Sequence, residues 1–147
     1  MRFGVRFALD LGAVRIGVAK SDPSGMLASP YSVWSAESIL TELENLIAEH
    51  SPLEIYIGLP KDLSGRDAIA ATAVRAQAHT LKNRFPGMHF LLVDERMTTA
   101  EARKQLQQAG YNTKTDRQLI DAAAATVLLQ AALEAERIQG TPRGEAL

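Results

Sequence analysis

The sequence contains no cysteine. This absence excludes disulfides, zinc sites built on thiolates and thiol catalysis. No apolar run reaches the roughly 20 residues that a membrane helix needs, and residues 1–6 lack the apolar core and cleavage site of a secretory signal. These absences favour a cytoplasmic protein that has no membrane partner.

Aromatic residues are also scarce, at 5% of the 147 residues, and none of them cluster. The sequence therefore offers no stacking platform for single-stranded nucleic acid. Neither sign of charge dominates, because 16 basic residues face 17 acidic ones and the net charge is −1. Any binding of nucleic acid must then depend on local basic groups that contact phosphate, rather than on a field from the whole protein.

The length suits one domain with one core, and the apolar pattern predicts a mixed α/β fold. Residues 3–9, 15–21 and 27–34 read as three strands, with turns at 10–13 and 22–25. A helix from Ser35 to about His50, a strand at 55–57, a helix at about 67–84 and a strand at 89–93 follow. Two capping boxes, Thr98 with Glu101 and Thr115 with Gln118, mark the start of the last two helices.

The predicted order is therefore β-β-β-α-β-α-β-α-α, which gives a mixed five-stranded sheet flanked by helices. The last helix is expected to end near Ile138. Residues 1–138 then form the single domain, and residues 139–147, which contain glycine, proline and charge, form a flexible tail.

Three carboxylates occupy informative positions in this order. Asp10 follows the first strand and Glu95 follows the fifth, and ligands of such sheets bind beyond the carboxyl ends of parallel strands. Asp121 lies past the first turn of the last helix, on the same face as Ala125 and Leu128, where a carboxylate is costly unless a cation accompanies it. The alternatives are a turn residue for Asp10, a polar connection with an internal salt bridge at 94–96, and an ion pair between Asp121 and Arg117.

Converging carboxylates repel one another, and hard divalent cations relieve that repulsion. Oxygen ligands indicate Mg²⁺ or Mn²⁺, and two such ions cleave phosphodiesters without any histidine. The three histidines, His50, His79 and His89, are scattered and are read as structural or surface residues. The basic residues expected near the site are candidate phosphate ligands: Arg15, Lys61, Arg66, Arg96, Lys114 and Arg117.

The residues at these positions resemble the YqgF (RuvX) family of RNase H-like nucleases, which are relatives of the RuvC resolvase. The matching segments are Asp10-Leu11-Gly12 with 15–19, then 57–60, then 94–99 with Glu101-Ala102, and finally 120–124. The resemblance extends over residues 4–138. It implies an RNase H-like fold, with Asp10, Glu95 and Asp121 as catalytic, metal-binding acids. One departure is Arg117, at a position where relatives often carry lysine.

The resemblance implies a nuclease with either of two substrates: the 5′ end of precursor 16S rRNA, or a Holliday junction. A junction needs two symmetric cuts and hence a homodimer, whereas RNA trimming needs one site. A phosphotransferase of the actin-like type is a third reading, but it requires a second Asp-x-Gly segment and a second lobe, which this sequence lacks. A non-catalytic nucleic-acid or ribosome-assembly factor with this fold is the remaining alternative.

Overall fold

The structure is a computed structural model, and it describes residues 1–97, 100–110 and 117–147; for residues 97, 101 and 117–121 it describes the backbone alone. Its helices and strands follow the predicted order, with one strand added at the end. They are β1 (Phe7–Leu11), β2 (Arg15–Ser21), β3 (Ala28–Ser35), η1 (Ala36–Ser38), α1 (Ile39–His50), β4 (Ile55–Leu59), α2 (Ala71–Arg84), β5 (Phe90–Asp94), η2 (Glu95–Met97), α3 (Ala100–Gln108), α4 (Arg117–Gln139) and β6 (Glu145–Ala146).

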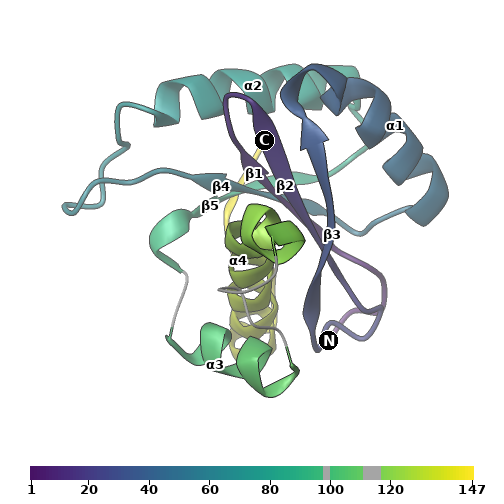
Figure 1. Ribbon diagram of the computed structural model, residues 1–147, viewed down its shortest axis with the longest axis vertical. Coiled ribbons are helices and arrows are strands. Elements are labelled where there is room, and N and C mark those ends of the chain that lie inside the picture. Colours follow the sequence, from purple (N-terminus) through teal and green to yellow (C-terminus); the bar gives the residue numbers. More distant parts are fainter. Residues whose placement is uncertain (98–99, 111–116) are drawn as a thin grey trace.

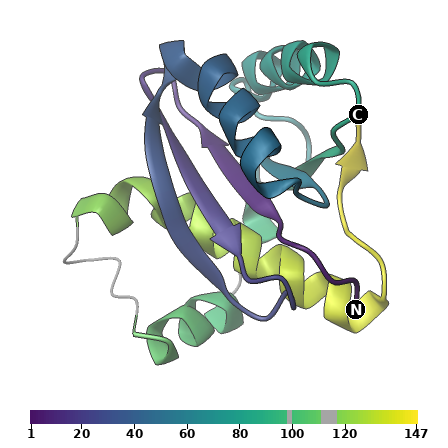
Figure 2. The same cartoon turned by 90° about the vertical axis from the view of Figure 1, so that its right-hand side faces the viewer.

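One mixed sheet forms the centre of the fold, with strand order β3-β2-β1-β4-β5-β6. The first three strands pair antiparallel, β1, β4 and β5 pair parallel, and β6 returns antiparallel to β5. Helices α1 and α2 cover one face of this sheet and α4 covers the other, with α3 packed against α4 (Figures 1 and 2). This confirms the predicted RNase H-like layout, although the sheet has six strands rather than five.

Successive side chains of a strand point to opposite faces of the sheet, so the core has one part on each face. Phe7 and Leu9 of β1 pack with α1 and α2, whereas Ala8 packs with α4. The residues of α4 that meet the sheet are small or branched, among them Ala125 and Leu128, so this helix lies close to the strands. None of the helices in the described part of the chain combines the length and hydrophobicity of a membrane-spanning segment.

The first strand begins and ends later than its apolar pattern predicts, since it runs over Phe7–Leu11 instead of 3–9. Before it, the amide of Gly4 donates to the carbonyl of Pro23 at 2.8 Å, which holds the start of the chain outside the ladder. At its other end, Leu11 pairs with Ile16, and the amide of Gly12 closes the hairpin on the carbonyl of Arg15 at 3.0 Å. Asp10 is therefore a strand residue rather than a turn residue.

Helix α2 also begins later than predicted, at Ala71 rather than near Asp67. The backbone of Asp67 forms an isolated bridge with Lys61, and its carboxylate pairs with Lys61 and Arg75. These interactions hold Asp67 in an extended conformation, which a helical first turn would break. The capping residues Thr98 and Thr115 lie outside the described residues.

The predicted tail differs most from the structure. The segment 139–147 was expected outside the domain, but its last residues extend the sheet. Leu91 and Leu92 of β5 pair with Ala146 and Glu145, and the amide of Leu147 donates to the carbonyl of Phe90 at 3.2 Å. The edge of β5 would otherwise present unpaired backbone groups, and β6 satisfies them.

Candidate active site

Asp10 points to the face of the sheet that α4 covers. It lies two residues after Ala8, which packs on that face, and side chains repeat every second residue along a strand. The side chain is half-buried, and burial raises the pKa of its carboxyl. Among the residues that the structure describes, no hydrogen bond or ion pair to this carboxylate compensates for the lost hydration. Within the described part of the chain, the site thus holds an acid whose charge no cationic side chain balances.

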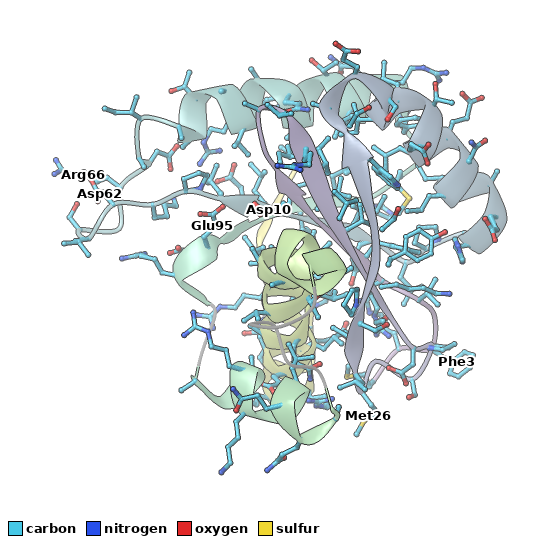
Figure 3. The ribbon with its side chains drawn as sticks, viewed as in Figure 1. Phe3, Asp10, Met26, Asp62, Arg66 and Glu95 are labelled. Atoms are coloured by element: carbon cyan, nitrogen blue, oxygen red, sulfur yellow. The ribbon has the colours of Figure 1, made fainter. Side chains whose placement is uncertain are left out.

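Glu95 reaches the same place from the adjacent part of the sheet. It opens η2, directly after β5 ends at Asp94. Loss of hydration raises the pKa of the Glu95 carboxyl, and the negative charges of Asp10 and Asp94 raise it further. Figure 3 shows Asp10 and Glu95 near each other above the first turns of α4. The two carboxylates therefore converge, as their predicted positions at the carboxyl ends of the first and fifth strands indicated, although Asp10 lies within β1 rather than after it.

Gly58 of β4, the strand between β1 and β5, allows this approach. A Cβ atom at this position would lie 3.2 Å from Cγ of Glu95 and 3.3 Å from Cδ2 of Leu128, both tighter than ordinary contacts. The backbone of β4 thus forms the floor under Glu95. Gly58 belongs to the matching segment 57–60 but was not among the residues predicted to bind metal or phosphate; its signal was a glycine at the end of an otherwise apolar strand.

Asp94, the neighbour of Glu95, has a different environment. Its carboxylate accepts hydrogen bonds from the side chain of Arg96, the shortest at 2.7 Å, and from the backbone amide of Arg96 at 2.8 Å. The guanidinium of Arg96 consequently lowers the pKa of the Asp94 carboxyl. This is the internal salt bridge that was one alternative for residues 94–96. It neutralises Asp94, whereas the neighbouring Glu95 faces Asp10.

The third predicted acid, Asp121, belongs to α4, four residues before the buried Ala125. Its side chain lies outside the described residues, as do the side chain of Arg117 and the whole of Lys114. Within the residues that the structure describes, no group of three acidic, histidine or cysteine side chains forms a metal site. The pair of Asp10 and Glu95 is therefore what the structure itself brings together.

The remaining basic candidates differ in how strongly they are held. Lys61 pairs with Asp67 at 2.6 Å. Arg66 is mostly exposed and lies 3.7 Å from Asp62, and Arg96 is held by Asp94. Arg15 is exposed at the start of β2, just after the turn that follows Asp10. Lys61 and Arg96 lie just after the carboxyl ends of β4 and β5, whereas Arg66 lies at the tip of the loop after β4, away from Glu95 (Figure 3).

The donor set fits a hard cation. Two carboxylates with raised pKa values face each other, and each holds its negative charge only at an energetic cost. Oxygen ligands of this kind are those that Mg²⁺ and Mn²⁺ prefer. A divalent cation between them would replace repulsion with attraction.

Comparison with known protein families identifies the family of this chain. A model of the RuvX family, described as Holliday junction resolvase, matches residues 4–135. The chain belongs to the RuvX family. Its nuclease class follows from that membership, and the resemblance read from the sequence is confirmed.

Similar RuvX proteins match over nearly the whole chain. A protein of Streptomyces coelicolor, named "Putative pre-16S rRNA nuclease", is 42% identical over 150 residues, which cover 100% of this chain and 90% of its own. A protein of Thermobifida fusca with the same name is 44% identical over 153 residues, covering 99% of this chain and 96% of its own.

The fold is similar to that of Thermus thermophilus RuvC. The structure of that protein in complex with a Holliday junction substrate superposes with a TM-score of 0.66 at 11% identity, and covers 97% of this chain and 99% of RuvC. A second Thermus thermophilus RuvC structure gives a TM-score of 0.61 at 13% identity, with the same coverage. At such low identity the likeness shows a shared fold.

Proposed function

We propose that this RuvX protein is a divalent-metal-dependent endonuclease that hydrolyses phosphodiester bonds in structured nucleic acid. The observation that carries the proposal is the convergence of Asp10 and Glu95, two carboxylates with raised pKa values, at one edge of the sheet. Nothing in a stable fold requires two acids to face each other, so the arrangement is best explained by a cation that binds between them. We propose residues 1–138 as the nuclease domain, to whose sheet β6 adds an edge strand.

In this proposal Asp10, Glu95 and Asp121 hold Mg²⁺ or Mn²⁺, as two ions. When bound, the ions would activate a water molecule and stabilise the leaving oxygen of the phosphodiester. Glu95 is kept in place by Gly58 beneath it, and Asp94 is kept from competing by Arg96. Helical spacing from Ala125 and Leu128 supports Asp121 as the acid that α4 contributes.

The chain's own basic residues bind and orient the substrate. Lys61 and Arg96 flank the carboxyl ends of β4 and β5, Arg66 lies on the loop that follows β4, and Arg15 lies near the turn after Asp10. We propose that these residues contact phosphates, together with Lys114 and Arg117. With a net charge of −1 and few aromatic residues, the protein would recognise phosphate positions and shape rather than bases.

We propose the 5′ end of precursor 16S rRNA as the substrate, since the curated relatives with about 40% identity carry that name. A Holliday junction is the second candidate, which the description of the family model favours. That substrate would require a homodimer, because two symmetric cuts need two active sites. A cytoplasmic location suits both substrates.

The test compares both substrates in one experiment. The purified protein is incubated with Mg²⁺, and separately with Mn²⁺, with a precursor rRNA 5′ leader and with a four-way DNA junction. Asp10→Asn, Glu95→Gln and Asp121→Asn should each lower the cleavage rate on the order of a thousandfold. Glu44→Gln, an exposed acid of α1 that pairs with Arg84, serves as the matched control and should cleave like the wild type.

Each result has a distinct meaning. Cuts in RNA alone indicate a processing nuclease, and paired nicks in the junction alone indicate a resolvase. Binding of nucleic acid without cleavage by the wild type, in either metal, would overturn the catalytic proposal and leave a binding factor that has an RNase H-like fold.

A further inference from the structure

The segment that joins β4 to α2, residues 60–70, starts near the acid pair and projects outward from it, and we call it the β4–α2 arm (Figure 3). Its tip is a tight turn around Asp62, whose Oδ1 accepts hydrogen bonds from the amides of Ser64 at 2.9 Å and Arg66 at 3.0 Å. Gly65 adopts a φ of +88°, which favours glycine. The arm is therefore shaped by its own hydrogen bonds, with Arg66 exposed on it.

The base of the arm is tied to two other elements by a chain of four charged side chains. Lys61 pairs with Asp67 at 2.6 Å, within the arm. Asp67 in turn accepts a hydrogen bond from Nε of Arg75 at 2.6 Å, and Nη1 of Arg75 reaches Glu145 at 2.5 Å. Arg75 belongs to α2 and Glu145 to β6, so Arg75 links the arm to the C-terminal strand.

The other side of the arm lies against η2, the short helix that begins with Glu95. A Cβ atom on Gly65 would lie 3.2 Å from Nη2 of Arg96, the residue that follows Glu95. Arg96 itself is anchored to Asp94 at the end of β5. The arm therefore lies between Arg75 on one side and η2 on the other, so a change in its position moves Lys61 and Arg66 relative to Glu95.

We infer that Arg75 is a positioning residue for nucleic-acid substrate: by bridging Asp67 and Glu145, it holds the β4–α2 arm where Lys61 and Arg66 meet substrate phosphates. This inference rests on the proposed function and extends it to a residue that does not touch the substrate. Arg75 suits the role because its planar guanidinium engages both carboxylates at once, through Nη2 as well as Nε and Nη1.

The ion pairs of Arg75 are partly exposed, so their loss can change the position of the arm without unfolding the protein. The side chains of Asp67 and Glu145 are 37% and 54% exposed, and ion pairs at such sites contribute little to the free energy of unfolding. Loss of Arg75 should therefore leave the fold intact. It should instead free Asp67 to bind Lys61 alone and let the arm move, which weakens phosphate contacts that depend on its position.

The experiment uses Arg75→Gln, Arg75→Lys and Glu145→Gln in the full chain, with Arg84→Gln as the matched control. Arg84 lies on the same helix and pairs with Glu44 at 3.3 Å, so its loss removes a comparable exposed ion pair away from the arm. Steady-state cleavage is measured on the nucleic acid that the wild type cuts. The affinity for the same molecule is measured in Ca²⁺ at several salt concentrations.

For Arg75→Gln we expect KM and Kd to rise roughly five- to tenfold, kcat to stay within about twofold, and the salt dependence of binding to weaken by about one phosphate contact. Glu145→Gln should shift in the same direction by less, because the contact to Asp67 remains. Arg75→Lys should restore part of the affinity, since lysine keeps the charge but not the fork. Arg84→Gln should match the wild type.

A Kd and salt dependence of Arg75→Gln equal to those of Arg84→Gln would overturn the inference. So would an equal fall of kcat and kcat/KM at unchanged KM, or a melting temperature well below that of Arg84→Gln, because either result indicates a general structural role. If the wild type binds nucleic acid but does not cut it, the proposed function fails while the binding measurements still decide the role of Arg75. If it neither binds nor cuts, both proposals fail.

Discussion

Carboxylates gather at both ends of the central sheet of this RuvX protein, and their surroundings are opposite. At the carboxyl ends of β1 and β5, Asp10 and Glu95 face each other; burial raises the pKa of both carboxyls, and the charge of Asp10 raises that of Glu95 further. At the amino ends of β1 and β4, Glu54 and Glu136 are almost fully buried, and two arginines neutralise them.

The neutralised end is a closed network. Arg2 donates to both glutamates, Arg6 donates to Glu136 at 2.8 Å, and the hydroxyl of Tyr56 donates to Glu54 at 2.9 Å. The burial of Tyr56 and the nearby negative charge of Glu54 raise the pKa of its hydroxyl, so it remains a donor. Both arginines also lie near the C-terminal end of α4, where cations are favoured. The protein thus can neutralise buried acids with arginine, and the convergence of Asp10 with Glu95 at the other end indicates function rather than poor packing.

The largest change in stability is expected from breaking the neutralised network. Glu136→Ala leaves the fully buried Arg6 without its carboxylate, and the loss of one partner of such a pair should lower the free energy of unfolding by about 3–5 kcal/mol. Urea denaturation of the metal-free protein measures this. Glu44→Ala, which removes the exposed partner of Arg84, should cost less than about 1 kcal/mol. Similar losses in the two variants would mean that the network contributes no more than a surface pair.

A smaller effect is expected from crowding the acid pair. Gly58→Ala places a methyl group 3.2 Å from Cγ of Glu95 and 3.3 Å from Cδ2 of Leu128, so Glu95 must move. We expect a loss of about 1–2 kcal/mol in stability and a fall in kcat of roughly tenfold, because a small displacement of a catalytic group slows chemistry.

Gly87→Ala is the matched control for Gly58→Ala, since a Cβ atom there has open space around it. It should change neither the stability nor the rate of cleavage. A Gly58→Ala variant that cuts at the wild-type rate, in spite of lower stability, would argue against Glu95 as a catalytic residue.

The two ends of the sheet also differ in how far the sequence could predict them, and the pair of Asp10 and Glu95 was predictable. Asp10 and Glu95 were predicted to share an edge because each follows an apolar strand, and the carboxyl ends of parallel strands meet. That reasoning needs only local patterns and the order of the elements. The same local patterns predicted the order of the elements along the chain, including the helices α1 and α4.

The neutralised network left no such local signal. Arg6 lies 130 positions from Glu136, and nothing near Arg6 indicates that it is buried. The pairing of β6 with β5, and the link from Asp67 through Arg75 to Glu145, are long-range contacts of the same kind. Single charged residues read as solvent-exposed by default, so a network that forms only between distant segments stays invisible until the fold brings them together.

The smallest expected effect is on how the stability of the metal-free protein changes with pH. The direction of this change distinguishes the end of the sheet that holds Asp10 and Glu95 from the neutralised end. The pKa values of Asp10 and Glu95 are raised in the folded state, so between the ordinary pKa and the raised one the folded protein binds more protons than the unfolded chain. Stability without metal should therefore be highest below the ordinary pKa of these acids and fall as the pH rises through their raised pKa values.

Asp10→Asn removes one of these acids and the repulsion that it exerts on Glu95. It should flatten this fall and stabilise the metal-free protein near neutral pH by less than about 1 kcal/mol, because solvent screens a partly exposed pair. Melting temperatures measured across pH in EDTA test the sign of this effect. Added Mg²⁺ should raise the melting temperature of the wild type by more than that of Asp10→Asn.

Asp22→Asn should have the opposite effect on stability. Hydrogen bonds from the amides of Leu27 and Met26 and from the Ser24 hydroxyl lower the pKa of the Asp22 carboxyl, so the loss of this carboxylate should destabilise the protein near neutral pH. If Asp10→Asn also proved destabilising in EDTA, the acid at the end of β1 would be a structural residue like Asp22, and the two ends of the sheet would not differ in kind.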